Sequence, residues 1–178
     1  HGLGWPGGWS DPAPGGKDSG SAPLISMLQG DSIYLAELEE ALGQIQSATG
    51  IEKLDLIGMD ACLMSQMEVY AMLQPYARFS VASEEVEPGL GWAYAAFLDN
   101  LVLNPSMDGA ALATAIVDTY IDQDQRIVDN QARAEFSGQG SLLGGFFSSP
   151  SISAAQLTDQ IERNITLTAF DLEAFADL

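Results

Sequence analysis

The chain has 178 residues, of which 47% are hydrophobic, and this length suits one domain, residues 1–178, with a buried core. Its formal net charge is −19, because 25 Asp and Glu residues stand against 6 Lys and Arg residues. A surface this acidic repels phosphate groups and anionic lipids, and no apolar run approaches the roughly 18 to 20 residues that cross a membrane, so we expect neither nucleic-acid nor membrane partners.

The first 50 residues are predicted to form a long loop and then a helix. Gly, Pro, Ser and Asp dominate residues 1–30, which predicts a surface loop that is flexible over residues 10–30. Asp31 and Ser32 are common helix-capping residues, and apolar side chains at helical spacing follow them. We expect this helix to end at Gly50.

The middle of the chain alternates predicted strands and helices. Residues 53–59 are short, apolar and bounded by turns, which is typical of a buried parallel strand. Helical spacing returns over residues 63–73, and residues 79–83 are predicted to form the next strand. An acidic turn, residues 84–89, follows this strand.

Beyond the turn, the sequence predicts two helices, over residues 92–103 and 108–129. Residues 131–160 are rich in Gly, Ser and Phe and are predicted to form a loop or flap. Residues 164–170 have the alternating apolar side chains of a strand. Strands that alternate with helices indicate an α/β layer fold with a mostly parallel sheet.

Cys62 is the candidate nucleophile, because it is the only cysteine and lies between a predicted strand and a predicted helix. Sites form beyond the carboxyl ends of strands in α/β sheets, and a helix N-terminus stabilises a thiolate relative to a thiol of pKa about 8.5. The alternative is a buried cysteine that only packs. A single cysteine also excludes internal disulfides and multi-cysteine metal sites.

His1, the only histidine, is the candidate general base for that thiol. A histidine at the first position can also be the remnant of a tag. The neighbouring Gly2 favours a catalytic role, because a glycine lets the backbone approach a substrate carbonyl and offer its N–H group.

Three segments of the sequence resemble one family of peptidases. They read HGxGW at residues 1–5, LDLIGMDACLM at residues 54–64 and SEExEPGxGWxY at residues 83–94. Together they are similar to the clostripain-like cysteine peptidases of the caspase-like fold. The resemblance covers about residues 1–120 and again residues 166–172, and it implies a caspase-like three-layer sandwich with a mostly parallel sheet.

The resemblance implies a cysteine endopeptidase that cleaves after Arg or Lys through a thioester intermediate. Cys62 would be the nucleophile and His1 its base, and the N–H groups of Gly2 and Cys62 would form the oxyanion hole. Asp60 would lie near the floor of the pocket that receives the basic side chain, because a buried cation needs a charged partner. From its position, Asp60 can alternatively cap the helix that follows.

Glu84, Glu85 and Glu87 form an acidic cluster with three open interpretations. The cluster reinforces a preference for basic substrates, binds calcium, or is a solvated turn. We assign Glu84 and Glu85 to substrate binding. We expect no metal ligand among the site residues and no required cofactor, with calcium as the open alternative.

Lys17 is a candidate processing site in the predicted flexible loop. It lies in the segment PGGKDSG, and flexible polar loops are preferred sites of nicking. A peptidase that prefers basic residues would cut itself after Lys17, and the loop would shield the cleft before this cut. The alternative is a solvating lysine in a tolerant loop.

The strand that precedes the histidine in this family is absent, so we expect the sequence to be a piece that lacks its N-terminal strands. The signal for a secreted or cell-surface location would then lie upstream of it. The rival hypothesis is a truncated, non-catalytic homologue whose acidic face binds calcium or a basic partner. The pair of Cys62 and His1 favours the enzyme, whose partners would be peptides or proteins with basic residues.

Overall fold

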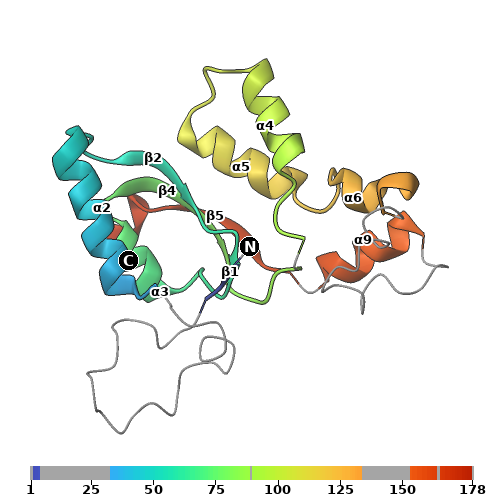
Figure 1. Cartoon of the computed structure of the whole chain (residues 1–178), viewed down its shortest axis with the longest axis horizontal. Coiled ribbons are helices and arrows are strands. Elements are labelled where there is room, and N and C mark those ends of the chain that lie inside the picture. The colour runs from blue at the N-terminus through green and yellow to red at the C-terminus, as the bar shows by residue number, and fades with distance from the viewer. Residues whose placement is uncertain (1, 5–32, 89, 134–152, 164, 178) are drawn as a thin grey trace, which may run out of the picture.

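Helices pack against both faces of a small mixed sheet in this protein (Figure 1). The structure is a computed structural model that describes residues 2–4, 33–88, 90–133, 153–163 and 165–177. Within these residues, no helix is both long enough and apolar enough to cross a membrane.

Three strands form the main sheet, β2 (Leu54–Gly58), β4 (Ala77–Ser83) and β5 (Leu167–Asp171), in the order β2–β4–β5. β2 is parallel to β4, and β5 is antiparallel to β4. The short strands β1 (Gly2–Leu3) and β3 (Ala61–Cys62) form a separate parallel pair. In the described part of the chain, two strand pairs are therefore parallel, as the sequence predicts, and the pair that β5 makes is not.

One face of the sheet is covered by α2 (Leu35–Thr49) and α3 (Met67–Leu73). α2 begins after Tyr34, whose N–H group donates to the carboxylate of Glu37, and it ends at Gly50 as predicted. Gly50 has a positive φ of 71°, which glycine adopts without steric cost. The core on this side contains buried residues of both helices, of β4 and of the turn after β5, namely Leu42, Val69, Tyr70, Met72, Leu73, Ala77 and Leu172.

The opposite face of the sheet is covered by α5 (Gly109–Thr119), on which α4 (Tyr94–Leu103) packs. Asp108 caps α5, because its carboxylate accepts the N–H group of Ala111 at 2.8 Å. Further helices along the chain include α6 (Gln125–Val128), α9 (Ala154–Glu162) and the short 3-10 helix η1 (Ala174–Asp177).

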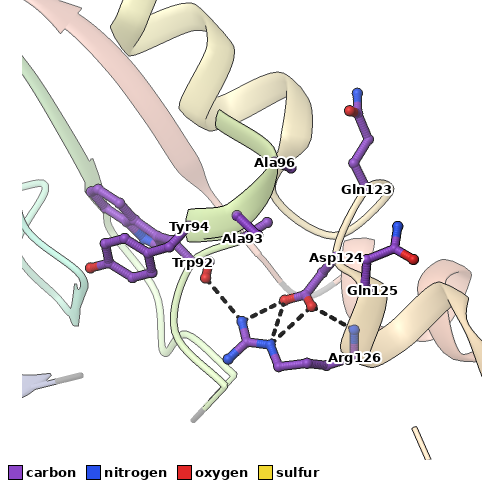
Figure 2. A pocket seen from close by; sticks show the side chains of 9 residues that line it. Trp92, Ala93, Tyr94, Ala96, Gln123, Asp124, Gln125 and Arg126 are labelled. Carbon is purple, nitrogen blue, oxygen red and sulfur yellow. Dashed lines mark hydrogen bonds and ion pairs between the residues drawn. The ribbon is translucent and has the colours of Figure 1, made fainter. Parts of the chain in front are cut away.

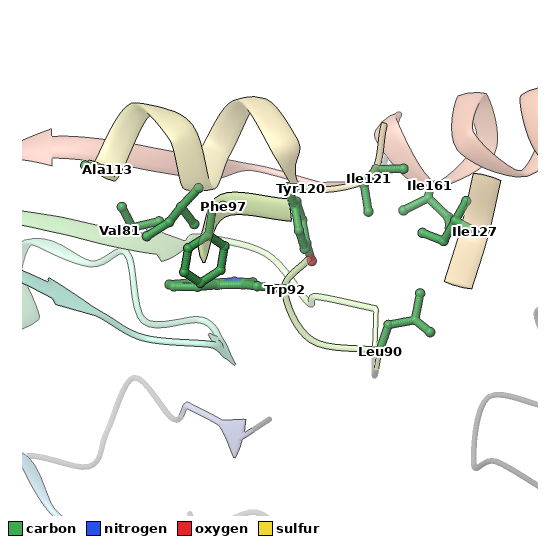
Figure 3. Packing of buried hydrophobic residues seen from close by; sticks show 10 residues of the cluster. Val81, Leu90, Trp92, Phe97, Ala113, Tyr120, Ile121, Ile127 and Ile161 are labelled. Carbon is green, nitrogen blue, oxygen red and sulfur yellow. The ribbon is translucent and has the colours of Figure 1, made fainter. Parts of the chain in front are cut away.

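A second core cluster lies between this face of the sheet and the helices α4, α5, α6 and α9 (Figure 3). The ring of Trp92 lies beneath Phe97 and beside Tyr120 in this cluster. Leu56 of β2 packs against this cluster, whereas Ile57 packs against the other, because successive residues of a strand point to opposite faces. β2 is thus apolar on both faces, as its sequence predicts.

Two predicted helices differ from the observed ones. Residues 63–66 are not helical, because they follow the edge of the sheet: the N–H group of Leu63 donates to the carbonyl of Glu85. The predicted helix over residues 108–129 ends at Thr119. A turn follows, and α6 begins after its own cap, Asp124.

The predicted loop or flap over residues 131–160 is helical at both of its ends, which corrects that prediction. Residues 131–133 are helical, and α9 occupies the other end of the range. Residues 134–152 and the predicted loop over residues 10–30 lie outside the described residues.

Candidate active site

Cys62 lies in β3, beside the described residues of the N-terminal segment. In the parallel pair, Leu3 is opposite Cys62, and the N–H group of Gly4 donates to the carbonyl oxygen of Cys62 at 2.6 Å. A β-carbon at Gly4 would lie 2.4 Å from that oxygen, so this close approach requires glycine. Gly2 precedes Leu3 in β1, and His1 lies outside the described residues.

The thiol of Cys62 is not at the start of a helix, which corrects the expectation from the sequence. Leu63 follows it with a positive φ of 61°, and α3 begins only at Met67. The sulfur instead lies 3.2 Å from the backbone nitrogen of Glu87 and 3.8 Å from its carbonyl oxygen. The N–H group of Glu87 therefore donates to the sulfur and helps to fix its position. Cys62 is buried, with 3% of its surface exposed.

Asp60 is half-buried, and its carboxylate binds the segment that leads into α4. Its Oδ2 atom accepts the N–H group of Trp92 at 3.1 Å and the hydroxyl group of Tyr94 at 3.0 Å. Asp60 therefore does not cap a helix, which was the alternative role that its position in the sequence allowed. Gly91, with a positive φ of 68°, permits this contact, because a β-carbon there would lie 2.5 Å from Oδ2 of Asp60.

Glu87 is buried beside Asp60, with 3% of its surface exposed. The pKa of its carboxyl group is raised to about 8, chiefly by burial and also by the nearby charge of Asp60, while a hydrogen bond from Trp92 acts in the opposite direction. That bond comes from the indole Nε1 of Trp92, 3.4 Å from Oε1. The protonated form of Glu87 is therefore favoured at neutral pH relative to an exposed carboxyl group. Burial and the Asp60 charge also raise the pKa of Tyr94, to about 12.

Glu84 and Glu85 lie apart from Glu87, so the acidic cluster predicted from the sequence does not converge. Both are exposed, and the backbone N–H group of Glu85 donates to the hydroxyl group of Thr166 at 2.9 Å. Among the described residues, no three His, Cys, Asp or Glu side chains are grouped so that they could hold a metal ion. The sequence did not indicate that Glu87 is buried while Glu84 and Glu85 are exposed, and no local pattern distinguishes the three residues.

Arg126 fixes the backbone of the segment that Asp60 binds (Figure 2). Its guanidinium group donates to the carbonyl oxygens of Leu90 at 2.7 Å and of Trp92 at 2.9 Å. The same group pairs with Asp124, whose side chain is 5% exposed, and hydrogen bonding to this carboxylate raises the pKa of Arg126. The segment that supplies both donors to Asp60 is thus held from its other side.

A pocket of about 270 Å³ lies beside Arg126 and Asp124 (Figure 2). Residues 92–96 and 123–126 line it, and its walls include Tyr94 and Arg126. Neither Cys62 nor Asp60 belongs to its lining, so this pocket is adjacent to the thiol site and distinct from it. Lys17, the predicted processing site, lies outside the described residues.

One comparison with known proteins shows the family of this chain, and another shows a similar fold. A model of the clostripain family matches residues 26–136. The fold is similar to that of a cysteine protease from B. fragilis, with a TM-score of 0.52, 20% identity, and coverage of 83% of this chain and 47% of that chain. At this identity the likeness shows the fold alone.

A second similar structure is a secreted cysteine protease from Bacteroides thetaiotaomicron, solved with an irreversible peptide inhibitor. Its TM-score is 0.47, with 19% identity and coverage of 83% of this chain and 32% of that chain. A comparison with curated proteins gave no match. The chain thus spans about half the length of the B. fragilis protein and about a third of the other.

Proposed function

Because the chain belongs to the clostripain family of cysteine peptidases, we propose that it carries the active site of an endopeptidase that cleaves after Arg or Lys. Cys62 is the nucleophile and His1 its general base in this proposal. The whole enzyme completes a caspase-like three-layer sandwich with further strands. The single observation that carries the proposal is that the Cys62 thiol lies beside the strand that follows His1 and beside the buried Glu87, with the half-buried Asp60 two residues away in the sequence.

The proposed reaction uses the Cys62 sulfur and the His1 imidazole. His1 accepts the thiol proton, and the sulfur attacks the scissile carbonyl carbon. The N–H groups of Gly2 and Cys62 stabilise the oxyanion of the tetrahedral intermediate. The C–N bond then breaks, His1 protonates the leaving amine, and a thioester remains. Water, deprotonated by His1, hydrolyses this thioester and regenerates the thiol.

Asp60 selects the basic side chain in this proposal. Its half-buried carboxylate lies two residues before the nucleophile, and two donors from residues 92–94 fix its orientation. A cation that leaves water for such a site needs a charged partner, which a carboxylate supplies and a neutral side chain does not. The exposed Glu84 and Glu85 attract basic substrates at longer range.

Cofactors and location follow from the same proposal. The reaction itself requires no cofactor, because thiol and imidazole supply both the nucleophile and the proton transfers. Calcium, if it acts, acts away from the reacting atoms. We place the protein in a secreted or cell-surface setting, where its acidic surface favours solubility.

Self-cleavage after Lys17 is the proposed activation step. The burial of Cys62 supports it, because a shielded thiol must become accessible before a peptide can reach it. Mass spectrometry of the wild type and of a Cys62→Ala variant tests this step. We expect a cut between Lys17 and Asp18 in the wild type only, and an active enzyme that stays in one piece would contradict it.

Covalent labelling tests the proposed function itself. An arginine peptide with a thiol-reactive group should label the intact enzyme at Cys62, and a matched citrulline peptide, which has the same shape without the charge, should label it far more slowly. The Cys62→Ala variant should remain unlabelled. If the arginine peptide does not label a correctly folded protein, the proposed function is wrong and the non-catalytic alternative is favoured.

A further inference from the structure

Arg126 of α6 holds the backbone of residues 90–92, the segment that supplies a donor to Asp60 (Figure 2). Its guanidinium group donates to the carbonyl oxygen of Leu90 at 2.7 Å and to that of Trp92 at 2.9 Å. The N–H group of the same Trp92 donates to Oδ2 of Asp60 at 3.1 Å. Arg126 therefore fixes the direction of a donor to Asp60 without contacting Asp60 through any of these hydrogen bonds.

Arg126 is itself held in place by Asp124. Its Nε atom donates to both carboxylate oxygens of Asp124, at 2.9 and 3.1 Å, and the side chain of Asp124 is 5% exposed. Asp124 also caps α6, because its carboxylate accepts the backbone N–H group of Arg126 at 2.8 Å. The pair of Arg126 and Asp124 therefore forms a rigid connection between α6 and residues 90–92.

The carboxylate of Asp124 also supplies a charge. Hydrogen bonding to Asp124 is the main cause that raises the pKa of Arg126, and the charge of Asp60 raises it as well, so Asp60 lies within electrostatic reach of the guanidinium group. An isolated guanidinium group at this place would repel a cationic side chain that approaches Asp60. Because Asp124 neutralises Arg126, the pair fixes the segment and adds no net charge of its own.

We propose that Arg126 and Asp124 are positioning residues for the selection of basic side chains. Arg126 orients Asp60 through residues 90–92, and Asp124 prevents the charge of Arg126 from repelling the substrate. This inference rests on the proposed function. An oriented carboxylate loses less entropy when a cation binds to it, so both residues act on the preference for arginine over citrulline and not on the reactivity of the thiol.

Arg126→Lys tests the role of the guanidinium group. Lysine keeps the charge, but its single nitrogen cannot span the carboxylate of Asp124 and two carbonyl oxygens at once. We expect kcat/KM for an arginine peptide to fall about fivefold, mainly through a higher KM, and that for the citrulline peptide to change less than about twofold. Alkylation of Cys62 by iodoacetamide should keep its rate within about twofold of the parent.

Arg163→Lys is the matched control, because it makes the same change in an exposed ion pair. Arg163 pairs with Asp159 at 2.8 Å on α9, and its printed contacts do not include residues 90–92. This variant should keep the arginine preference and the KM of the parent. A loss of preference in both variants would mean that the effect of Arg126→Lys does not come from its contacts with residues 90–92, and it would overturn the role of Arg126.

A double-mutant cycle with Asp60→Asn shows whether Arg126 acts through Asp60. When the charge of Asp60 is gone, its orientation no longer matters for a cation. Arg126→Lys should then change kcat/KM for the arginine peptide less than about twofold, against about fivefold when Asp60 is present. An equal loss on both backgrounds would mean that Arg126 only supports the fold, and it would overturn its role as a positioning residue.

Asp124→Asn tests the role of the neutralising charge. The amide oxygen can still cap α6 and accept from Arg126, so the geometry is kept while the negative charge is lost. We expect KM for the arginine peptide to rise about threefold at an ionic strength of about 0.01 M and to change little at about 1 M, where salt screens the charge. KM for the citrulline peptide should stay constant at both salt concentrations.

Asp108→Asn is the control for this variant, because Asp108 caps α5 in the same way, at the end of that helix far from Asp124 in the sequence. It should leave both KM values unchanged. If Asp124→Asn weakens both peptides equally and independently of salt, Asp124 acts on the fold and its proposed role is wrong. If Arg126→Lys does not fold, the salt dependence of Asp124→Asn still decides the proposal.

The parent enzyme distinguishes a failure of this inference from a failure of the proposed function. If the parent enzyme is labelled at Cys62 and prefers arginine to citrulline, but neither Arg126→Lys nor Asp124→Asn changes this preference, the inference is wrong and the proposed function stands. If the arginine peptide does not label the correctly folded parent enzyme, the proposed function is wrong, and this inference with it.

Discussion

One oxygen of Asp60 receives two donors that come from the same short segment, the N–H group of Trp92 and the hydroxyl group of Tyr94. The segment is in turn fixed by Arg126. A carboxylate held in this way is oriented before a ligand arrives, so binding loses less conformational entropy. The identity of Asp60 as a candidate is readable from the sequence, but its two donors are not, because they lie more than 30 residues away.

Replacing Asp60 by asparagine should remove the preference for basic residues. The amide oxygen can still accept both donors, so the fold should be retained while the negative charge is lost. We expect kcat/KM for an arginine peptide to fall about 100-fold, or roughly 3 kcal/mol, and that for the citrulline peptide to change little. An unchanged arginine preference would move the determinant to Glu84 or Glu85.

Two serines of β4 should respond in opposite ways to replacement by alanine. Ser80 and Ser83 are both fully buried, but Ser83 shares a hydrogen bond with Thr166 at 3.2 Å, whereas the hydroxyl group of Ser80 has no partner among the described residues. Ser83→Ala should lower the free energy of unfolding by about 1 kcal/mol, and Ser80→Ala should leave it unchanged or raise it by up to about 1 kcal/mol. Denaturant unfolding of both variants measures this difference.

At the scale of elements, the sequence predicts those whose signals are local. α2 ends at Gly50 and β2 lies where the apolar run of residues 53–59 places it. The start of α3 was wrong by four residues, because the N–H group of Ser65 donates to Ser83 and the preceding residues pair with β1. Such long-range hydrogen bonds override helical spacing, and a single sequence does not contain them.

The end of α5 shows a signal that sequence reasoning overlooked. The apolar pattern continues past Thr119, which favoured one long helix, but Asp124 accepts the N–H group of Arg126 and starts a new one. An Asp at such a position is a common N-cap, so the break was readable. The antiparallel direction of β5 was not, because the alternation of apolar side chains is the same in either direction.

The packing of α5 on the sheet can be tested with two helical glycines. A β-carbon at Gly109 would lie 2.6 Å from the carbonyl oxygen of Asp55 in β2, whereas one at Gly43 in α2 would meet only the hydroxyl group of Tyr76, at 3.7 Å. Gly109→Ala should therefore destabilise the protein by about 1–3 kcal/mol. Gly43→Ala should stabilise it by about 0.5–1 kcal/mol through helix propensity.

Thermal unfolding of the two alanine variants, measured by circular dichroism beside the parent, gives the sign of each change. Equal melting temperatures for the two variants would mean that α5 can shift away from β2 without loss.

For the molecule as a whole, the stability should decrease as the pH rises from about 5 to 8. The formal charge of −19 contributes through repulsion, and Glu87 contributes through its proton. Its pKa is raised from 4.5 to about 8 in the folded protein, so its stabilising contribution is complete below 4.5 and is lost as the pH rises through 8.

A variant of Glu87 separates its contribution to the pH dependence of stability from that of the net charge. Between pH 5.5 and 7.5, the free energy of unfolding of the Cys62→Ala protein should fall by about 2 kcal/mol more than that of the same protein with Glu87→Gln. Denaturant titrations at both pH values measure this difference. Parallel decreases in the two proteins would show that Glu87 ionises in the folded state as it does in the unfolded chain.

The positive φ of Leu63, directly after the candidate nucleophile, has an evolutionary consequence. A left-handed conformation costs a residue with a side chain about 1 kcal/mol relative to glycine, so Leu63→Gly should relieve strain in the folded protein. The same change adds backbone freedom beside Cys62, and we expect the variant to unfold at a similar or higher temperature but to turn substrate over more slowly. Selection for activity would then keep a side chain at this position against the direction in which stability alone would drive it.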